Sequence, residues 1–206
     1  MYIPPHFAET LPQELERIIR ENPLGMLVTH QGEGFDANHI PFEFDPGAGG
    51  HGMLTAHVAR ANPVWQRAVS EPVMVAFRGV AGYISPSWYP SKHEAHRQVP
   101  TWNYEVVHVH GVLAVQDNER FARGLVARLT RRHEASEPTP WKMGDSAPEF
   151  IDAMLRNIVG IEIAITSMEA KVKLSQNKEV RDRVGASDAL EKKGLSRLAG
   201  RMRPAE

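Results

Sequence analysis

Short strand-like runs separated by tight turns constrain the fold of this 206-residue chain more than any other feature. The early turns are Gly-rich or contain Asp-Pro, at residues 32–34 and 45–52. Several short strands with tight connections favour a closed antiparallel sheet over a parallel α/β layer. We therefore predict a mainly β, α+β fold. The predicted strands cover residues 24–30, 35–44, 53–58, 73–77, 103–115 and 158–165.

Four helical patterns interrupt these runs. Thr10 is a candidate N-cap, and the apolar stripe that follows it ends near Asn22. Asn62 and Pro63 are suited to the N-cap and first position of a short helix. Residues 118–133 are amphipathic, and the capping-box pattern at 146–149 starts the last predicted helix.

Length and charge distribution predict one main domain with an extension. A chain of this length can bury a substantial core, and we assign residues 1–170 to it. Residues 171–206 carry an excess of Lys and Arg and few apolar side chains after Leu174. This composition predicts a basic C-terminal extension that lies at the surface or is mobile.

Overall composition excludes several classes of protein. The net charge of −1 argues against bulk electrostatic attraction to nucleic acid or membrane. No apolar run approaches the roughly 20 residues of a membrane span, and no charged-then-apolar leader opens the sequence. The absence of cysteine excludes disulfides and thiolate chemistry. We therefore predict a cytoplasmic protein without a membrane segment.

Aromatic residues gather between residues 82 and 104, which hold two of the four tryptophans and three of the four tyrosines. Prolines at 86, 90 and 100 favour a shaped loop over a helix. Flat rings beside short polar groups suit a planar, hydrogen-bonding ligand, although a packed loop under a sheet edge uses the same residue types. The candidate binding residues here are Tyr83, Ser85, Trp88, Lys92, Thr101 and Trp102.

An anion site is predicted where a strand runs into the helix that starts at Asn62. Exposed backbone N–H groups at a helix start favour an anion, and Arg60 could add a bidentate contact to phosphate, with His57 as a third group. The alternative is a surface arginine that pairs with an acid. Asn38 and His39 form a second polar pair within a strand, where a satisfied half-buried histidine is the alternative interpretation.

Two histidines, His108 and His110, alternate with valines, so strand geometry places both imidazoles on one face. A zinc site would need a third ligand that the sequence does not identify, and we predict no metal. A polar cavity or a subunit interface suits the two histidines better.

Residues 171–177 form a segment of short polar and basic side chains. Lys173 and Gln176 in this segment could close over an anionic ligand or belong to an ordinary basic linker. No nucleophile elbow, dinucleotide fingerprint or Walker loop is present.

At these same positions the chain resembles the PaiB family of FMN-binding negative transcriptional regulators. The matching stretches spread along the sequence, and those that contain tryptophan are specific. They are residues 1–4, 38–41, 57–63, 83–89, 99–104, 108–111 and 173–177.

The resemblance implies an FMN-binding split β-barrel that forms a homodimer with the flavin at the subunit interface. It implies that the strand from Asp36 to Pro41 lies along the isoalloxazine, and that the turn with His57, Arg60 and Asn62 takes the phosphate. It also implies that His108 and His110 approach from the barrel, while the aromatic loop covers the site from the same subunit or its partner.

Two functions follow from the sequence and the resemblance. The first is a PaiB-type, FMN-binding repressor that acts on transcription directly or indirectly; the basic tail is the only candidate for DNA contact. The alternative is a flavin-dependent oxidoreductase, or a related haem- or pyridoxal-handling protein, on the same scaffold. A dimeric binding protein without catalysis is the third and plainest possibility.

Overall fold

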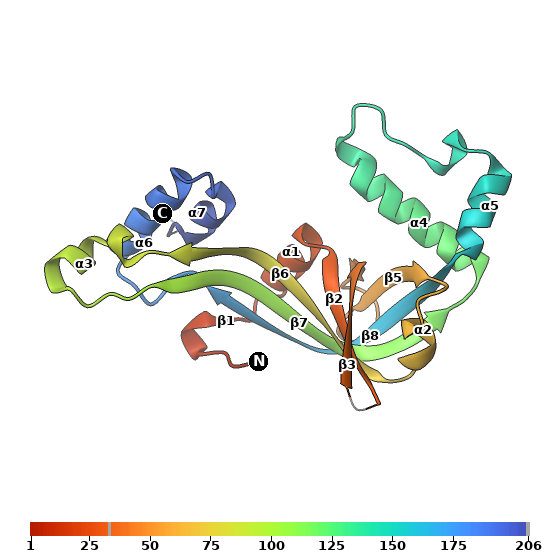
Figure 1. Ribbon diagram of the computed structural model, residues 1–206, viewed down its shortest axis with the longest axis horizontal. Coiled ribbons are helices and arrows are strands. Elements are labelled where there is room, and N and C mark those ends of the chain that lie inside the picture. Colours follow the sequence, from red (N-terminus) through yellow and green to blue (C-terminus); the bar gives the residue numbers. More distant parts are fainter. Residues whose placement is uncertain (33, 205–206) are drawn as a thin grey trace. The chain divides into compact units, whose positions relative to one another are not determined.

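The computed structural model describes residues 1–32 and 34–204 (Figure 1). Its strands are β1 (Ala8–Glu9), β2 (Leu24–Gln31), β3 (Gly34–Pro41), β4 (Glu43–Asp45), β5 (Met53–Ala59), β6 (Pro72–Ile84), β7 (Thr101–Gln116) and β8 (Ile158–Lys173). Its α-helices are α1 (Pro12–Glu21), α2 (Val64–Arg67), α3 (Pro90–Ala95), α4 (Glu119–His133), α5 (Pro148–Arg156), α6 (Val180–Glu191) and α7 (Ser196–Met202). Four 3₁₀ turns are η1 (Pro5–Phe7), η2 (Pro86–Trp88), η3 (Glu134–Ser136) and η4 (Met143–Asp145).

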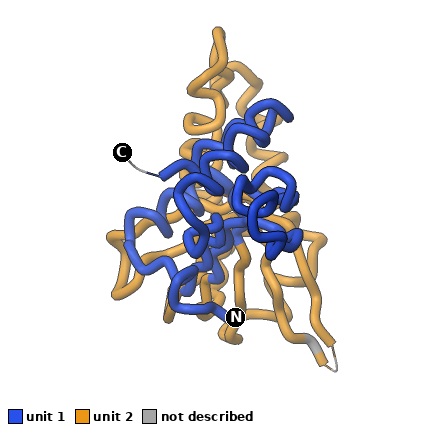
Figure 2. The backbone as a smooth tube through the Cα atoms, turned by 90° about the vertical axis from the view of Figure 1, so that its left-hand side faces the viewer, with its two compact units in different colours: residues 1–22, 77–108, 169–206 blue, residues 23–76, 109–168 orange. Residues whose placement is uncertain are grey.

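The chain forms two compact units, each assembled from segments that are distant in sequence (Figure 2). Unit 1 consists of Met1–Asn22, Phe77–His108 and Glu169–Glu206, and unit 2 consists of Pro23–Ala76 and Val109–Met168. The strands follow the order β3-β2-β6-β7-β8-β5-β4, with β1 paired to β8. Strands β6, β7 and β8 contribute residues to both units, so the long strands connect them covalently.

Unit 2 is an antiparallel sheet whose two ends approach each other. β2 pairs with β3 from Leu24↔Pro41 to Gln31↔Gly34, and β5 pairs with β8 from Met53↔Ala164 to Ala59↔Ile158. β3 also contacts β5. There Asn62 Nδ2, just after β5, donates to Asn38 Oδ1 on β3 at 2.8 Å. The predicted closed antiparallel sheet within an α+β fold is therefore confirmed.

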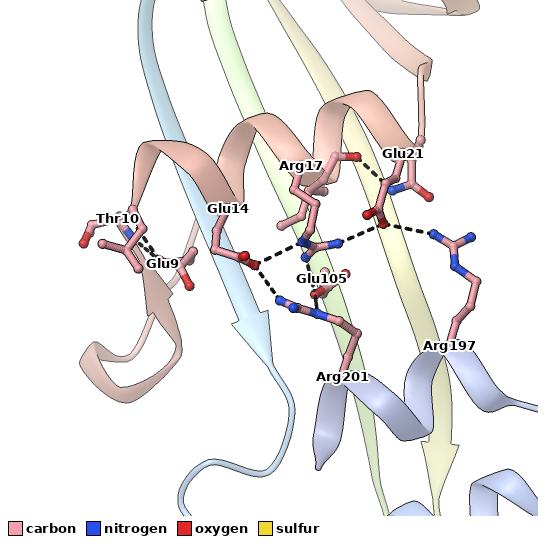
Figure 3. A network of polar contacts seen from close by, with 11 residues as sticks. Glu9, Thr10, Glu14, Arg17, Glu21, Glu105, Arg197 and Arg201 are labelled. Carbon is pink, nitrogen blue, oxygen red and sulfur yellow. Dashed lines mark hydrogen bonds and ion pairs between the residues drawn. The ribbon is translucent and has the colours of Figure 1, made fainter. Parts of the chain in front are cut away.

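Unit 1 places helices against one face of its strands and leaves the other face open. Along β7 the odd-numbered residues from 103 to 113 are buried, whereas the even-numbered ones are half-buried or exposed, as strand alternation requires. The buried face carries Glu105, whose carboxylate meets Arg17 of α1 and Arg201 of α7 (Figure 3). A Cβ on Gly82 of β6 would lie 2.6 Å from Leu198, so α7 also packs closely on this face.

The C-terminal segment is a folded part of unit 1, whereas its charge composition predicts a separate, surface-lying extension. Leu190, Leu198 and Met202 are buried, and so is the carboxylate of Asp182. Most of its arginines are held by acids or carbonyls; the pairs are Arg181–Glu94, Arg181–Glu179, Arg183–Met202 O, Arg197–Glu21, Arg201–Glu14, Arg201–Glu105 and Arg203–Asp188. Charge content failed as a guide here because the partners lie far away in the sequence.

The sequence predicted which helices and strands exist better than it predicted where they begin and end. The predicted strand 35–44 is divided into β3 and β4, and β6 and β8 run well beyond the predicted 73–77 and 158–165. Thr10 is not the cap of α1: the Glu9 carboxylate accepts from the N–H groups of Thr10 and Leu11. The predicted aromatic loop contains η2 and α3 and begins inside β6. No helix in residues 1–32 and 34–204 has the length and apolarity needed to span a membrane.

Candidate functional site

The open face of unit 1 gathers aromatic rings and lysines from four segments. Because Trp102 and Tyr104 are two residues apart on β7, their side chains share a face opposite the buried Asn103. We define the aromatic–lysine face by its side chains, which come from the N-terminal segment, β6, β7 and β8. They are Tyr2, Tyr83, Trp102, Tyr104, Lys171 and Lys173.

The rings of this face are open to solvent. Tyr2, Tyr83 and Trp102 are 82%, 46% and 56% exposed. The rings of Tyr83 and Trp102 meet edge to face with centroids 6.4 Å apart. Three exposed rings gathered on one face, in contrast to rings exposed singly, mark a surface suited to a flat apolar ligand or partner.

Two lysines, Lys171 and Lys173, give the face a positive charge. Lys171 Nζ lies 5.6 Å from the ring centre of Tyr2 and 5.5 Å from that of Tyr104. Lys173 Nζ donates to the Thr101 hydroxyl and, at 2.6 Å, to the Trp102 carbonyl. Burial is the main cause that lowers the pKa of Lys173, and the positive charges of Lys171 and Lys178 lower this pKa further. Within the described residues no ion pair joins Lys171 or Lys173 to an acid, so the two lysines can accept an anion.

His108 continues the same face of β7 and lies beside an acid. Its Nδ1 is 3.6 Å from Glu169 Oε1, and that carboxylate also accepts from the Met1 ammonium at 2.6 Å. His108 therefore belongs to the neighbourhood of the rings, as a titratable group with a carboxylate partner.

Several other motif residues form a buried polar core behind this face. Ser175 lies in the left-handed backbone region at φ 64°, and its Oγ lies 3.0 Å from Tyr89 Oη and accepts from Asn103 Nδ2 at 2.9 Å. Next to them, Asp182 accepts from the backbone N–H and the hydroxyl of Ser91 at 3.0 and 2.6 Å. These side chains fasten the segment after β8 and helix α6 to the aromatic loop, which is a structural role.

The remaining predicted residues of unit 1 lie beside the face without a shared contact. Ser85 Oγ accepts from Ser87 N at 3.3 Å and so caps η2. Trp88 is half-buried beneath Lys193, whose Nζ is 5.9 Å from its ring centre. Lys92 is half-buried in α3. Gln176 is engaged with backbone groups: its Nε2 donates to Val172 O and its Oε1 accepts from Leu174 N at 2.7 Å.

In unit 2 the predicted polar groups of β3 and the β5–α2 turn do come together. Asn38 accepts from Asn62 as described above and donates to Asp36 Oδ2 at 2.9 Å. Asn62 Oδ1 accepts from Val64 N at 3.0 Å, but the N-cap of α2 is Pro63 and not the predicted Asn62. His39 is exposed on β3.

Arg60 pairs with an acid, as the alternative interpretation of the sequence predicted. Its Nη1 and Nη2 donate to the two Asp117 oxygens at 2.9 and 2.6 Å, and its remaining donors reach the carbonyls of Arg156 and Ile158 at 2.8 and 3.1 Å. Hydrogen bonding to Asp117 raises the pKa of Arg60. A phosphate at Arg60 would have to displace Asp117, so the phosphate role stays a prediction that this arrangement disfavours.

Replacing Arg60 tests this reassignment. We expect Arg60→Ala to leave the affinity for FMN within about twofold, because the guanidinium is already satisfied by protein groups. Isothermal titration of the apoprotein with FMN measures it, with exposed Arg120→Ala as the charge-matched control. A loss of tenfold or more specific to Arg60→Ala would restore the phosphate assignment.

His57 is mostly enclosed on β5, and its Nδ1 has no hydrogen-bond partner within the described structure. Burial lowers the pKa of His57 below the ordinary 6.5. The imidazole is therefore neutral near pH 7, which suits a packed histidine better than a cationic phosphate ligand.

This burial predicts a pH dependence of stability. The unfolded chain binds the His57 proton more readily than the folded chain, so the free energy of unfolding should fall as pH drops through about 6.5, the unfolded value. Urea titrations at pH 7.5 and 5.5 should show a smaller difference for His57→Gln than for the parent protein. Exposed His51→Gln is the control, and equal differences in all three proteins would contradict the assignment.

His110 lies in unit 2 along an apolar groove of about 450 Å³. Phe35, which is 80% exposed, and His30 form one wall, with ring centroids 5.3 Å apart. Thr166 Oγ1 donates to His110 O at 3.1 Å.

The prediction that His108 and His110 share one face of β7 is confirmed, because Val107 and Val109 are fully buried on the opposite face. No three potential metal ligands cluster anywhere in the described ranges.

The sequence reasoning missed Tyr2, Tyr104 and Lys171 as members of the face. Alternation could have found two of them: Tyr104 is two residues from Trp102, and Lys171 is two residues from Lys173. Tyr2 carries no such signal, because its position depends on how the N-terminal segment crosses the strands.

Comparison with known proteins identifies the family to which this chain belongs. The family model described as "Putative FMN-binding domain" matches residues 1–167. The chain is 32% identical over 192 residues to "Protease synthase and sporulation protein PAI 2" of Bacillus subtilis, and the match covers 93% of this chain and 89% of that protein. The chain therefore belongs to this family of FMN-binding domains, with FMN as its cofactor, and the resemblance to PaiB is confirmed.

Solved structures support the fold. The FAD and heme binding protein from Mycobacterium smegmatis matches with a TM-score of 0.59 at 15% identity, covering 81% of this chain and 73% of that one. The flavocytochrome Anf3 from Azotobacter vinelandii matches with a TM-score of 0.57 at 10% identity, covering 81% and 69%. At these identities the similarity concerns the fold alone, and the predicted antiparallel split barrel is confirmed.

Proposed function

We propose that the protein binds FMN on the aromatic–lysine face and acts as a PaiB-type negative regulator of transcription. The observation that carries the binding site is the pair of Lys171 and Lys173 beside exposed Trp102. In this arrangement the lysines bind the phosphate and the rings of Trp102 and Tyr83 support the isoalloxazine. When bound, FMN supplies the redox chemistry, and the protein supplies binding and orientation.

The chemistry of the face fits FMN in two independent respects. A dianionic phosphate favours a site with ammonium groups that have no acidic partner, and among the described residues Lys171 and Lys173 are two such groups on this face. A flat conjugated ring favours stacking or edge contacts with aromatic side chains, and Trp102 offers an exposed ring. Neither property is shared by the Arg60 turn, whose cation is neutralised by Asp117.

Titration of the apoprotein with FMN and with riboflavin tests the proposed site. Absorbance in the flavin bands reports occupancy, and Trp102→Ala should weaken both ligands by roughly tenfold, because ring contacts contribute about 1 kcal/mol beyond the buried area. Phe150→Ala removes an aromatic side chain of similar exposure, 55%, on α5 and should leave both affinities unchanged. Equal behaviour of the two variants would exclude the face as the flavin site.

The proposed effect on transcription is indirect. The C-terminal arginines, which are half of the cationic groups of the predicted DNA-binding segment, are engaged by acids or carbonyls. A DNA surface needs cations that are free to contact phosphates. We expect the purified protein, with and without FMN, to show no preference for promoter duplexes over random duplex at any salt concentration. A specific affinity that falls steeply with rising salt would overturn this part of the proposal.

The second candidate is a flavin-dependent oxidoreductase, favoured by His108. This histidine lies on the same side of β7 as Trp102 and 3.6 Å from Glu169, so the face also carries a group that can hold a proton. Oxidation of NADH or NADPH by the FMN-loaded protein is the distinguishing assay. No turnover with either donor at saturating flavin would leave the regulator as the remaining function.

Homodimer formation and a cytoplasmic location also remain proposals. Large side chains such as Tyr2, Phe35 and Val99, which are 82%, 80% and 72% exposed, supply apolar surface suited to a second subunit. Light scattering coupled to size exclusion measures the mass, and a monomer at micromolar concentration would exclude a stable dimer.

A further inference from the structure

Unit 2 contains a second concave site, outside every residue assigned to the flavin. A pocket of about 410 Å³ is lined by residues of the C-terminal half of α4 and of the segment that leads into η4. This volume lies within the range of small-molecule sites. Apolar side chains form most of its lining; they are Ala127, Ala135, Pro140, Trp141 and Met143.

The wall that carries Trp141 is held in place by backbone contacts. Trp141 N donates to Glu134 Oε2 at 2.9 Å, and Lys142 N donates to Asp145 Oδ2 at 3.0 Å. Met143 packs against the buried cluster that joins α4 to α5. Prolines at 138 and 140 further restrict this segment. The pocket is therefore shaped before a ligand arrives, which lowers the entropic cost of binding.

The polar lining has an excess of positive charge. Arg131 and Lys142 border the pocket, and neither has an acidic partner among the described residues. Glu134 is the one acid of the lining, and one of its oxygens is taken by Trp141 N. The Thr130 hydroxyl adds a neutral donor. An apolar pocket with two free cations at its border favours a ligand with an apolar body and one anionic group.

We propose that this pocket binds a small aromatic carboxylate. The ring stacks on or against Trp141, which is 40% exposed, and Arg131 receives the carboxylate in a two-pronged contact, with Lys142 as a second cation. The site is independent of the flavin face because no residue belongs to both.

Binding of 2-naphthoate to the full-length, FMN-loaded protein tests this proposal. Calorimetry should show saturable binding of one equivalent, and the cation 2-naphthylmethylamine, which has the same ring system, should bind at least tenfold more weakly. Arg131→Ala should weaken 2-naphthoate about tenfold, the scale of one charged hydrogen-bonding partner. Trp141→Ala should weaken it by a similar factor through loss of the ring contact.

Two controls make the outcome specific. Arg120→Ala removes an exposed arginine of the same helix outside the pocket and should leave 2-naphthoate binding unchanged. Arg131→Ala should retain its FMN affinity, so failure of this pocket is separable from failure of the flavin site. The proposal is overturned by absence of saturable 2-naphthoate binding, by equal affinity for the amine, or by equal losses in Arg131→Ala and Arg120→Ala.

Discussion

Glu105→Ala should lower the free energy of unfolding by about 3 kcal/mol, the largest effect on stability that we expect from one side chain. Glu105 is fully buried on β7, and its Oε1 accepts from Arg17 Nη2 at 2.7 Å and from Arg201 Nε at 2.8 Å (Figure 3). Removing the carboxylate leaves two guanidinium groups at the edge of the core with one fewer partner. Urea denaturation followed by circular dichroism measures the loss.

The expected loss lies at the low end for broken buried ion pairs for two reasons. Arg17 and Arg201 are 21% and 33% exposed, so water partly solvates them. Both also keep Glu14, at 3.1 and 2.6 Å. A further point favours a measurable loss: Arg17 belongs to α1 and Arg201 to α7, so Glu105 joins the two ends of the chain within unit 1.

An exposed ion pair on α1, the helix that carries Arg17, is the matched control. Arg20 Nε and Glu16 Oε1 of α1 are 2.6 Å apart, but their side chains are 45% and 34% exposed. We expect Glu16→Ala to cost less than about 1 kcal/mol, since solvent screens such a pair. Similar losses in Glu16→Ala and Glu105→Ala would show that burial of the carboxylate adds nothing.

Much of the fold could be predicted from the sequence because strand alternation is a local property. The Val-His-Val-His pattern predicted that the two histidines share one side of β7 and the two valines the other, and Val107 and Val109 are indeed buried together. The ends of β6 were missed, because a strand that continues past Gly79 and Gly82 looks like a turn in sequence. Both glycines are explained by close neighbours, Glu105 and Leu198, that only the tertiary structure reveals.

The candidate site was predicted in composition but not in detail. Asn, Ser and Tyr side chains serve equally well as ligand contacts and as parts of a buried polar core. The sequence therefore could not show that Trp102 is exposed while Tyr89 is buried, or that Ser175 is buried while Lys173 is not. Parity along β7 separates exposed Trp102 from buried Asn103 once the buried face is known, but Tyr89 and Ser175 lie outside the strands. The partners of charged side chains were beyond reach for another reason: Asp117 lies 57 residues from Arg60.

Loss of both strand lysines should abolish most of the phosphate contribution to FMN binding. We expect Lys171→Ala combined with Lys173→Ala to weaken FMN roughly a hundredfold, because each charge-assisted contact contributes about 1.5–3 kcal/mol and neighbouring contacts add incompletely. Lys173 is half-buried and Lys171 is held over Tyr104, so both are positioned before the ligand binds.

Riboflavin makes the measurement specific, because it has the flavin ring and ribityl chain but no phosphate. Its affinity for the double variant should stay within about threefold of that for the parent protein, whereas the affinity for FMN collapses and loses its salt dependence. Arg120→Ala combined with Lys192→Ala removes the same net charge from exposed positions outside the face and should leave both ligands unaffected. Equal losses for FMN and riboflavin would mean that the lysines hold the fold of the face and not the phosphate, and unchanged FMN binding would place the phosphate elsewhere.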